Sequence, residues 1–347
     1  MLAAKYLGPH RISAVETENV KPRDGEAVLR VDGCGICGTD LYIASGKHPR
    51  AVPGLIVGHE FSGRIVEFGP GGSESTDLGV GDRVTCFPLI TCGKCHACRS
   101  GNSHVCRSLG LYGIDREGGM AEYVRVPVSA LIKLPDSLSR DAGALIEPLA
   151  VGVHAVERVP GPVTANDTAV VIGAGPIGLV TALALRDRGV ERIFVTEPDD
   201  FRRDLARQLL FETLHPLEED VVEVVRARTA GEGVDLVFEA AGSPTAARQM
   251  TDLVRPRGVI VNVSVFKEPV SIDMQAVNFK ELEVVGTRVY TMDDYRTAIE
   301  VAQRGDLEKI MTHTFPLEEV SEAFELFRSG REVCKVIIDP VGGALRS

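Results

Sequence analysis

The sequence lacks several features that would assign it to a simpler class of protein. Residues 1–6 do not begin an apolar run of the roughly 7–15 residues that a secretory signal peptide needs, so we expect a cytoplasmic protein with eight reduced cysteines. Lysine and arginine are scattered rather than clustered, and the net charge is −11, which disfavours a nucleic-acid partner. Repeats and low-complexity tracts are also lacking.

Charge is missing from one stretch, residues 168–185, which is just long enough to suggest a membrane span. Three glycines and a proline interrupt it, however. A buried strand that runs through a glycine turn into a core-facing helix has the same hydropathy, so we expect no membrane segment. At 347 residues, the chain is long enough for two domains with substantial apolar cores.

The first half of the chain has a β pattern. Up to about residue 135, short β-rich runs are broken by glycine and proline. Strands are predicted at residues 27–31, 61–68, 83–87 and 121–126. We expect these strands to form a compact, irregular β domain.

The segment from Gly35 to Asp40 places several polar groups within a few residues. Cys37 offers a thiolate, which is a soft metal ligand. The hydroxyl of Thr39 follows two residues later, close enough to exchange a proton with a group bound to that metal. Thr39 and Asp40 also predict the N-cap of a short helix at residues 41–45.

His59 and Glu60 add an imidazole and a carboxylate at the entrance to a predicted strand. Together with Cys37 they supply three ligand types suited to zinc. The alternative for His59 is a partly buried histidine without a metal. Cys34 and Cys37 form a C-x-x-C pair, but the βαβ context of a thioredoxin-like site is missing, so we interpret Cys34 as a small buried residue.

Four further cysteines lie in one loop: Cys92, Cys95, Cys98 and Cys106. Four reduced thiols in this arrangement predict a tetrahedral site without an open position, which we assign to structural zinc. A ferredoxin-type cluster is disfavoured, because its last cysteine stands closer to the others and precedes a proline, whereas Arg107 follows here. A redox disulfide is the remaining alternative. Cys86 and Cys334 lie in apolar strand patterns and are interpreted as buried.

The clearest fold signal begins at residue 169. A buried strand at 169–172 leads through Gly173-Ala174-Gly175-Pro176-Ile177-Gly178 into a helix pattern at 179–188. This is the dinucleotide-binding fingerprint in its strand–turn–helix setting. Its glycines let a pyrophosphate approach the backbone at the helix N-terminus.

The next strand pattern, 192–196, indicates which dinucleotide binds. It ends at Glu197, nineteen residues after Gly178. An acid at this place binds the adenosine ribose hydroxyls, and its charge repels a 2′-phosphate, so we expect NAD. Arg202 and Arg203 follow closely and keep NADP as the alternative, because an arginine can recruit a phosphate.

The second half of the chain continues with alternating patterns. Strands are predicted at 234–240, 259–265 and 282–289, and helices at 218–228 and 245–254. These units predict an α/β fold with a doubly wound parallel sheet. A helix pattern at 141–159 precedes this part. Helix patterns at 293–304 and 317–328 and a strand at 334–338 follow it, and we expect this tail to return to the first domain.

These motifs together resemble the zinc-dependent medium-chain dehydrogenase/reductase superfamily over essentially the whole chain. Glu60 and the run from Leu145 to Val151 are similar to its polyol, threonine and butanediol dehydrogenase branch. The resemblance implies an irregular, β-rich, GroES-like catalytic domain at 1–155 and 297–347, with a structural zinc lobe at about 88–108. It implies a Rossmann dinucleotide-binding domain at 156–296.

The resemblance also implies the site residues. Two zinc ions are expected, one structural and one catalytic. Cys37, His59 and Glu60 would hold the catalytic ion, with Glu147 as a fourth ligand or as a neighbour that tunes the bound water. Thr39 would hydrogen-bond the substrate alcohol. The implied cofactor contacts are Gly173, Gly175, Pro176, Ile177, Gly178, Glu197, Arg202, Val263, Val265, Thr287 and Arg288.

Three places depart from that branch. Tyr42 stands where its threonine and butanediol dehydrogenases usually carry a histidine, which leaves the outer proton path undefined. Phe-Glu-Thr at 211–213 replaces a common Gly-Ala, so we expect an altered third Rossmann strand. Residues 69–79 form an insertion that predicts a surface loop.

The expected reaction is the NAD-linked oxidation of a secondary alcohol with a neighbouring hydroxyl or amine, such as 2,3-butanediol, sorbitol or L-threonine. The alternatives are a primary-alcohol or aldehyde dehydrogenase, a zinc-free quinone or enoyl reductase, and a noncatalytic NAD-binding protein that kept the fold. The complete ligand set disfavours the last two. The resemblance implies a homodimer or homotetramer, paired through 282–289. Substrate specificity is expected to depend on Tyr42, Ile43, His48, Leu111 and Tyr112.

Overall fold

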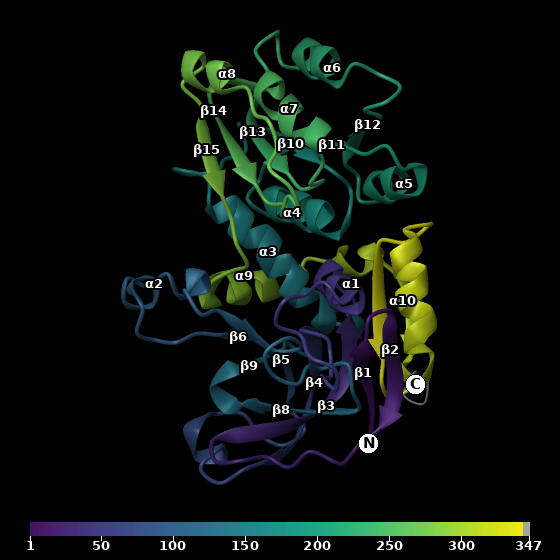
Figure 1. Cartoon of the computed structure of the whole chain (residues 1–347). Coiled ribbons are helices and arrows are strands. Elements are labelled where there is room, and N and C mark those ends of the chain that lie inside the picture. Colours follow the sequence, from purple (N-terminus) through teal and green to yellow (C-terminus); the bar gives the residue numbers. More distant parts are fainter. Residues whose placement is uncertain (343–347) are drawn as a thin grey trace. The chain divides into compact units, whose positions relative to one another are not determined.

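The computed structural model describes residues 1–342 of the chain. They divide into two compact units. Unit 1 contains Met1–Glu147 and the C-terminal part of the chain from Thr291, and unit 2 contains Pro148–Tyr290 (Figure 1). The chain therefore changes unit at 147/148 and 290/291, eight and six residues before the boundaries expected from the sequence.

Unit 1 is built on a seven-stranded sheet with the order β16-β17-β3-β4-β5-β9, to which β8 is added beside β3. Most neighbours are antiparallel, and β16 and β17 are parallel. The C-terminal strand β17 pairs with β3, so the end of the chain completes this sheet. The strands are β3 (Glu26–Gly35), β4 (Glu60–Phe68), β5 (Arg83–Cys86), β8 (Tyr123–Pro127), β9 (Leu131–Lys133), β16 (Met311–Pro316) and β17 (Lys335–Asp339).

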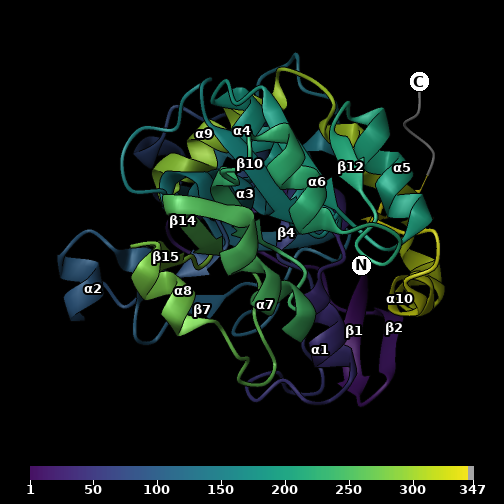
Figure 2. The same ribbon diagram turned by 90° about the horizontal axis from the view of Figure 1, so that it is seen from above.

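Smaller elements surround this sheet. The hairpin of β1 (Leu2–Gly8) and β2 (Arg11–Glu16) lies beside α10 (Val320–Ser329) in both views (Figures 1 and 2). Strands β6 (Leu89–Ile90) and β7 (Gly110–Leu111) pair at the base of a lobe that carries α2 (His96–Arg99). Unit 1 also holds α1 (Gly38–Ala44) and α9 (Met292–Ala302), with single 3₁₀ turns at Ser73–Ser75, Ser103–Val105, Val128–Ala130, Asp141–Leu145, Leu307–Ile310 and Leu317–Glu319.

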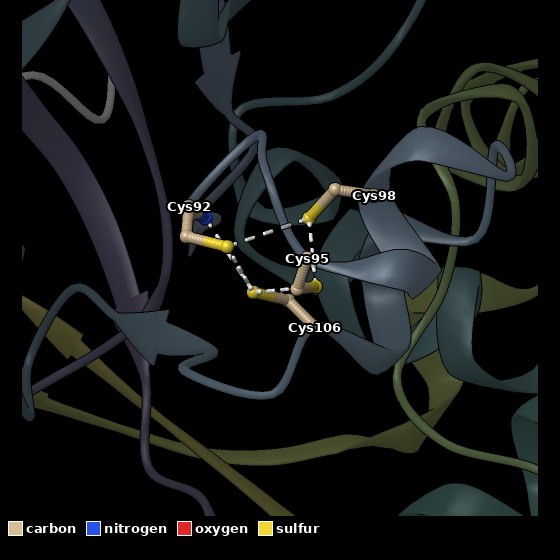
Figure 3. Close-up of side chains that lie close together, drawn as sticks. All are labelled: Cys92, Cys95, Cys98 and Cys106. Carbon is tan, nitrogen blue, oxygen red and sulfur yellow. Dashed lines mark hydrogen bonds between the residues drawn. The ribbon is translucent and has the colours of Figure 1, made fainter.

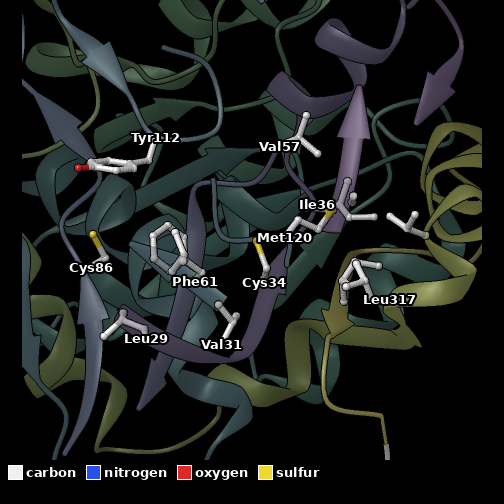
Figure 4. Packing of buried hydrophobic residues seen from close by; sticks show 14 of the residues in the cluster. Leu29, Val31, Cys34, Ile36, Val57, Phe61, Cys86, Tyr112, Met120 and Leu317 are labelled. Carbon is white, nitrogen blue, oxygen red and sulfur yellow. The ribbon is translucent and has the colours of Figure 1, made fainter. Parts of the chain in front are cut away.

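The core of unit 1 lies along β3 and β4 (Figure 4). Leu29, Val31 and Phe61 are fully buried, because both strands are apolar at almost every position that faces the centre. Burying a side chain of this size contributes about 1.5–3 kcal/mol. Cys34 and Cys86 are buried free thiols in the same cluster, in agreement with the sequence interpretation.

Unit 2 confirms the predicted doubly wound parallel sheet. Six parallel strands run in the order β12-β11-β10-β13-β14-β15, so the strand order reverses between β10 and β13. Ligands of such sheets bind outside the carboxyl ends of the strands at this reversal. The strands are β10 (Thr168–Ile172), β11 (Arg192–Thr196), β12 (Glu212–Leu214), β13 (Val234–Glu239), β14 (Val254–Asn262) and β15 (Glu283–Gly286).

The helices of unit 2 follow the strands in βα units. They are α4 (Pro176–Asp187), α5 (Asp200–Gln208), α6 (Val221–Arg228), α7 (Pro244–Leu253) and α8 (Met274–Phe279), preceded by α3 (Ile146–Glu157), which starts at the border of unit 1. The uncharged run at 168–185 becomes β10, the glycine turn and most of α4. Within residues 1–342, no helix has both the length and the apolar content to span a bilayer.

Several predicted elements change their bounds. The third Rossmann strand forms despite the departure at 211–213, but β12 has only three residues. The helix predicted at 141–159 begins as the 3₁₀ turn Asp141–Leu145 and becomes α-helical only at Ile146. The strand predicted at 282–289 shortens to the four residues of β15, which leaves Thr287 and Arg288 in the loop that follows it.

Candidate active site and metal centres

Cys37, His59 and Glu60 come together in unit 1. Their candidate ligand atoms all lie within 4.8 Å of one another. Glu60 opens β4 directly opposite Gly35 of β3, and Cys37 stands two residues after that strand ends. A thiolate, an imidazole and a carboxylate in one place form a donor set that suits zinc.

Asp40 supports this cluster in a way that the sequence did not indicate. The helix begins at Gly38 with Cys37 as its N-cap, so the predicted cap at Thr39 and Asp40 is wrong. Asp40 is instead the third helical residue, and its Oδ2 accepts a hydrogen bond of 2.9 Å from the backbone N–H of Cys37. The other oxygen lies 4.0 Å from Nδ1 of His59. At this distance the two atoms do not form a hydrogen bond, and Asp40 contributes a buried negative charge beside the imidazole.

The charges around His59 are those of a metal site. Burial alone would lower the pKa of His59, but the Cys37 thiolate, Asp40 and Glu147 raise it well above its usual range. Desolvation by burial raises the pKa of Asp40. Protonation of His59 therefore competes with metal binding, which requires the neutral imidazole.

Thr39 and Glu147 take different places relative to this cluster. Thr39 is half-buried in the first turn of α1, two residues after Cys37. Glu147 is buried in the first turn of α3. It is outside the set of ligand atoms that converge within 4.8 Å, but its charge raises the pKa of His59 and of Lys335, which places it beside the cluster.

The four loop cysteines form a second cluster in the lobe around α2 (Figure 3). The Sγ–Sγ distances are 3.5 Å for Cys95–Cys98 and Cys92–Cys106, 3.9 Å for Cys95–Cys106 and 4.0 Å for Cys92–Cys98. Tetrahedral zinc with Zn–S bonds of about 2.3 Å requires sulfurs about 3.8 Å apart. All four are free thiols, and the backbone N–H groups of Lys94 and Cys95 lower the pKa of Cys92 to about 6.

The fingerprint turn has the geometry that the sequence predicts. Gly173 has a φ of +103°, and a Cβ at this residue would lie 3.1 Å from the backbone nitrogen of Ala241. A Cβ at Gly178 would overlap the carbonyl oxygen of Gly173, so the helix packs directly against the turn. Gly175 faces open space except for Nη1 of Arg202, 4.0 Å from its ideal Cβ. Pro176 and Ile177 open α4, whose N-terminus faces any anion held there.

Glu197 and the two arginines behind it have distinct partners. One oxygen of Glu197 accepts from the Ala174 N–H at 2.8 Å, and the other accepts from the Asp199 N–H at 3.0 Å. Arg203 is buried, donates to the carbonyl of Glu197 at 2.9 Å and pairs with Asp200. Arg203 therefore has a structural role, and Arg202 is the arginine that stands beside the fingerprint turn.

Glu239 is a site residue that sequence reasoning missed. It is fully buried at the end of β13, and one oxygen accepts from the backbone N–H groups of Ala241 and Gly242, at 2.9 and 2.7 Å. The other oxygen accepts from the Ser264 hydroxyl. One carboxylate thus ties together the loops that follow β13 and β14. An acid that directly follows the apolar run Leu236–Phe238 and precedes Ala-Ala-Gly was the available signal.

The remaining predicted cofactor contacts follow strands β14 and β15. Val263 is buried and Val265 is exposed, so the two differ in what they can contact within unit 2. Oγ1 of Thr287 is buried, and no partner for it is found among residues 1–342. Arg288 is exposed. These four residues lie near the carboxyl ends of the sheet, where parallel sheets bind ligands.

Comparison with known proteins places the chain in a family. Residues 23–136 match the family model of the alcohol dehydrogenase GroES-like domain, and residues 176–304 match that of zinc-binding dehydrogenases. The 2-dehydro-3-deoxy-L-galactonate 5-dehydrogenase of Pseudoalteromonas atlantica is 35% identical over 342 residues, which cover 98% of each chain. The chain belongs to the zinc-dependent medium-chain dehydrogenases.

Relatives named for threonine and diol oxidation place this dehydrogenase in the threonine and polyol branch. The 2R,3R-butanediol dehydrogenase of Bacillus subtilis superimposes with a TM-score of 0.89 at 31% identity and covers 98% of this chain and 99% of that one. The L-threonine 3-dehydrogenase of Pyrococcus abyssi is 37% identical over 326 residues, covering 91% of this chain and 92% of the relative. A zinc-binding dehydrogenase from Sinorhizobium meliloti, solved with NADP, superimposes with a TM-score of 0.90 at 32% identity and covers 98% of this chain and 99% of that one. The resemblance found in the sequence is confirmed.

The side chains expected to set the specificity of the dehydrogenase differ in accessibility. Tyr42 is 44% exposed on α1, and its ring meets that of His48 edge-on, with centroids 5.8 Å apart. Leu111 is half-buried. Ile43 and Tyr112 instead belong to the hydrophobic core of unit 1. Tyr42 is therefore the exposed member of this set, and His48 and Leu111 are half-buried.

Proposed function

We propose that this dehydrogenase oxidises a secondary alcohol bearing a neighbouring hydroxyl or amine, with NAD as hydride acceptor. The observation that carries the proposal is the convergence of Cys37, His59 and Glu60 within 4.8 Å in unit 1. Zinc, when bound there, supplies a Lewis acid that lowers the pKa of the substrate hydroxyl, and NAD supplies the acceptor for the hydride.

Two zinc ions per chain fit the residues present. Cys37, His59 and Glu60 provide three protein ligands, the number that catalytic zinc sites use while they keep a position open for substrate. Glu147 stands next to this set and is the proposed fourth, exchangeable ligand. The tetrathiolate of the lobe is closed and has no open position, so its proposed role is structural.

The side chains divide the remaining work. Thr39 accepts the proton of the substrate hydroxyl and passes it outward, and Asp40 places a buried negative charge beside His59. In unit 2, the N–H groups at the start of α4 hold the pyrophosphate. Glu239 fixes the loops after β13 and β14, at the carboxyl ends of the strands where a nicotinamide ring is held.

NAD is the proposed cofactor because of the charges behind β11. Glu197, Asp199 and Asp200 are three acids within four residues, and Arg203 is already engaged. Arg202 stands beside the turn and is the arginine that would meet a 2′-phosphate. We expect a larger kcat/KM for NAD than for NADP, and Arg202→Ala should lower the NADP value more than the NAD value. A preference for NADP that survives Arg202→Ala would contradict this assignment.

The substrate class is proposed from the branch. The two curated relatives are named for oxidation at C3 of L-threonine and at C5 of a deoxygalactonate. A second heteroatom next to the reacting hydroxyl could contact the metal or Glu147. The test is NADH formation by the zinc-loaded enzyme with L-threonine, vicinal diols, sugar acids and simple primary alcohols.

Each outcome of this panel has a definite meaning. Turnover of diols or amino alcohols supports the proposal, and activity confined to primary alcohols would contradict it. Activity that persists after zinc removal points to a zinc-free reductase. Tight NAD binding without turnover of any alcohol by fully zinc-loaded protein points to a noncatalytic NAD-binding protein.

We also propose a homodimer that pairs β15 with its copy. This strand ends the sheet of unit 2, and exposed apolar side chains of α8 and β15, namely Met274, Phe279 and Val284, accompany it. An uncovered edge strand with exposed apolar residues favours pairing with another chain. Val284→Lys should shift the molecular mass in light scattering toward that of the monomer.

The free thiols suit a reducing compartment, and the cytoplasm is the proposed location.

A further inference from the structure

A buried lysine contacts the proposed catalytic zinc site. Lys335 is the first residue of β17, and its Nζ forms an ion pair with Oε2 of Glu60. Each of these two side chains is only 2% exposed. Nζ also donates a hydrogen bond of 3.0 Å to the carbonyl of Ile36, next to Cys37. A charge this deeply buried is costly unless it has a partner of opposite sign.

Three neighbouring strands build this contact. Lys335 lies on β17, Glu60 lies on β4, and β3 runs between them. The middle strand carries Gly35 at the crossing point, paired with Glu60 on one side and Ile337 on the other. A Cβ at Gly35 would overlap Glu60 Oε2 and would come within 3.0 Å of Lys335 Cε. The missing side chain at Gly35 is therefore the passage through which Lys335 reaches Glu60.

The negative groups near Lys335 favour its charged form. Burial would lower the pKa of its ammonium group, but Glu60, Cys37 and Glu147 raise it above its usual value. Glu60 and Cys37 are also two of the three candidate metal ligands. Lys335 and a bound metal would therefore share these two negative groups.

We propose that Lys335 takes the place of the catalytic zinc as the cation next to Glu60 in the metal-free protein. It is a positioning residue that holds Glu60 there, and it lowers the affinity of the site for the metal. This inference rests on the proposed catalytic zinc site. Without Lys335, the buried Glu60 carboxylate of the metal-free protein would lose its paired cation, whereas in the metal-loaded protein the metal would take that place. Repulsion between the ammonium and a nearby dication acts in the same direction.

Removal of Lys335 should therefore tighten metal binding. The test compares wild type, Lys335→Met, Lys335→Arg and the control Lys133→Met, whose side chain in unit 1 is 59% exposed. Cobalt(II) or zinc is titrated into metal-free full-length protein against a chromophoric chelator. The tetrathiolate site serves as the internal reference, because its cobalt absorption is more intense than that of a site with one thiolate.

We expect Lys335→Met to bind metal at the second site about tenfold more tightly, or better, than wild type. Lys335→Arg and Lys133→Met should stay close to wild type, and the tetrathiolate site should be unchanged in all four proteins. The melting temperature of Lys335→Met should fall in the metal-free form and recover in the metal-loaded form. If the metal-free variant does not fold, the rate of metal loss from the loaded variant to excess chelator gives the same comparison, and slower loss is expected.

Three results would overturn different parts of this reasoning. Wild type that binds only one metal ion, at the tetrathiolate, refutes the catalytic site and with it the proposed function. Wild type that binds two ions, with equal or weaker binding at the second site in Lys335→Met, overturns the role of Lys335 alone. Equal losses of melting temperature in the metal-free and metal-loaded forms would show that Lys335 only packs the core.

Discussion

Glu239→Ala is the most informative substitution in the cofactor half of the enzyme. It removes a fully buried carboxylate that accepts hydrogen bonds from the Ala241 and Gly242 backbones and from Ser264. Hydrogen bonds to a charged group contribute about 1.5–3 kcal/mol each. Ala241 is exposed, so water can replace part of the hydrogen bonding that its N–H group loses. We therefore expect the substitution to make the ordered conformation of the two loops about 3 kcal/mol less stable.

This cost should appear as weaker NADH binding. If both loops must be ordered before the cofactor binds, about 3 kcal/mol corresponds to roughly a 100-fold higher Kd. Glu239→Gln is the matched control, because its amide oxygen still accepts from both backbone N–H groups and its NH₂ can donate to Ser264. The control should lose less than about tenfold.

The assay is a titration of NADH fluorescence with zinc-loaded protein, together with its thermal melting temperature. Wild-type affinity in Glu239→Ala would refute the ordering role. Equal losses in the Ala and Gln variants would show that the negative charge matters, rather than the geometry of the loops.

Three further predictions concern unit 1. Thr39→Ala should lower kcat about 100-fold, whereas Thr39→Ser should retain most activity, because the hydroxyl relays the proton. Equal rates for the two variants in a steady-state assay would contradict the relay. Cys98→Ser should reduce the zinc content by one ion and make the α2 lobe sensitive to proteolysis, whereas NADH binding should persist. Two retained zinc ions would contradict a closed tetrathiolate. Gly35→Ala should lose the catalytic zinc and keep the structural zinc in a metal analysis, because the added Cβ would overlap Glu60. Gly38→Ala is the control and should keep both ions, because its Cβ would have no neighbouring atom within 4 Å.

Local motifs were predictable where chemistry and spacing coincide. The four lobe cysteines come together as their spacing predicted, and the glycines at 173–178 form the expected turn between β10 and α4. Both signals are local, because their geometry is set within about twenty residues of chain. The cap of α1 was predicted wrongly for the same reason: Thr39 and Asp40 are both good caps in isolation, and the surrounding contacts decided that Asp40 turns back to Cys37.

Contacts between distant segments could not be predicted in this way. Arg202 and Arg203 are adjacent and chemically identical in sequence, yet one is buried against Glu197 and the other stands beside Gly175. In the sequence, Glu239 looks like any residue at the end of a strand. Its role depends on the hydrogen bond from Ser264, which lies on the loop after β14. In each case the partner lies on another element, so no periodicity or spacing records the contact.

The sequence by itself determined the family, the residues of the two candidate metal sites and the glycine turn of the dinucleotide fingerprint, because those depend on residue types at short, fixed separations. Only the tertiary structure decided that Lys335, 275 positions after Glu60, reaches its carboxylate across Gly35. That contact exists because β17 and β4 flank β3 in one sheet. Strand order is a property of the whole fold, and it places charges together that the linear chain keeps apart.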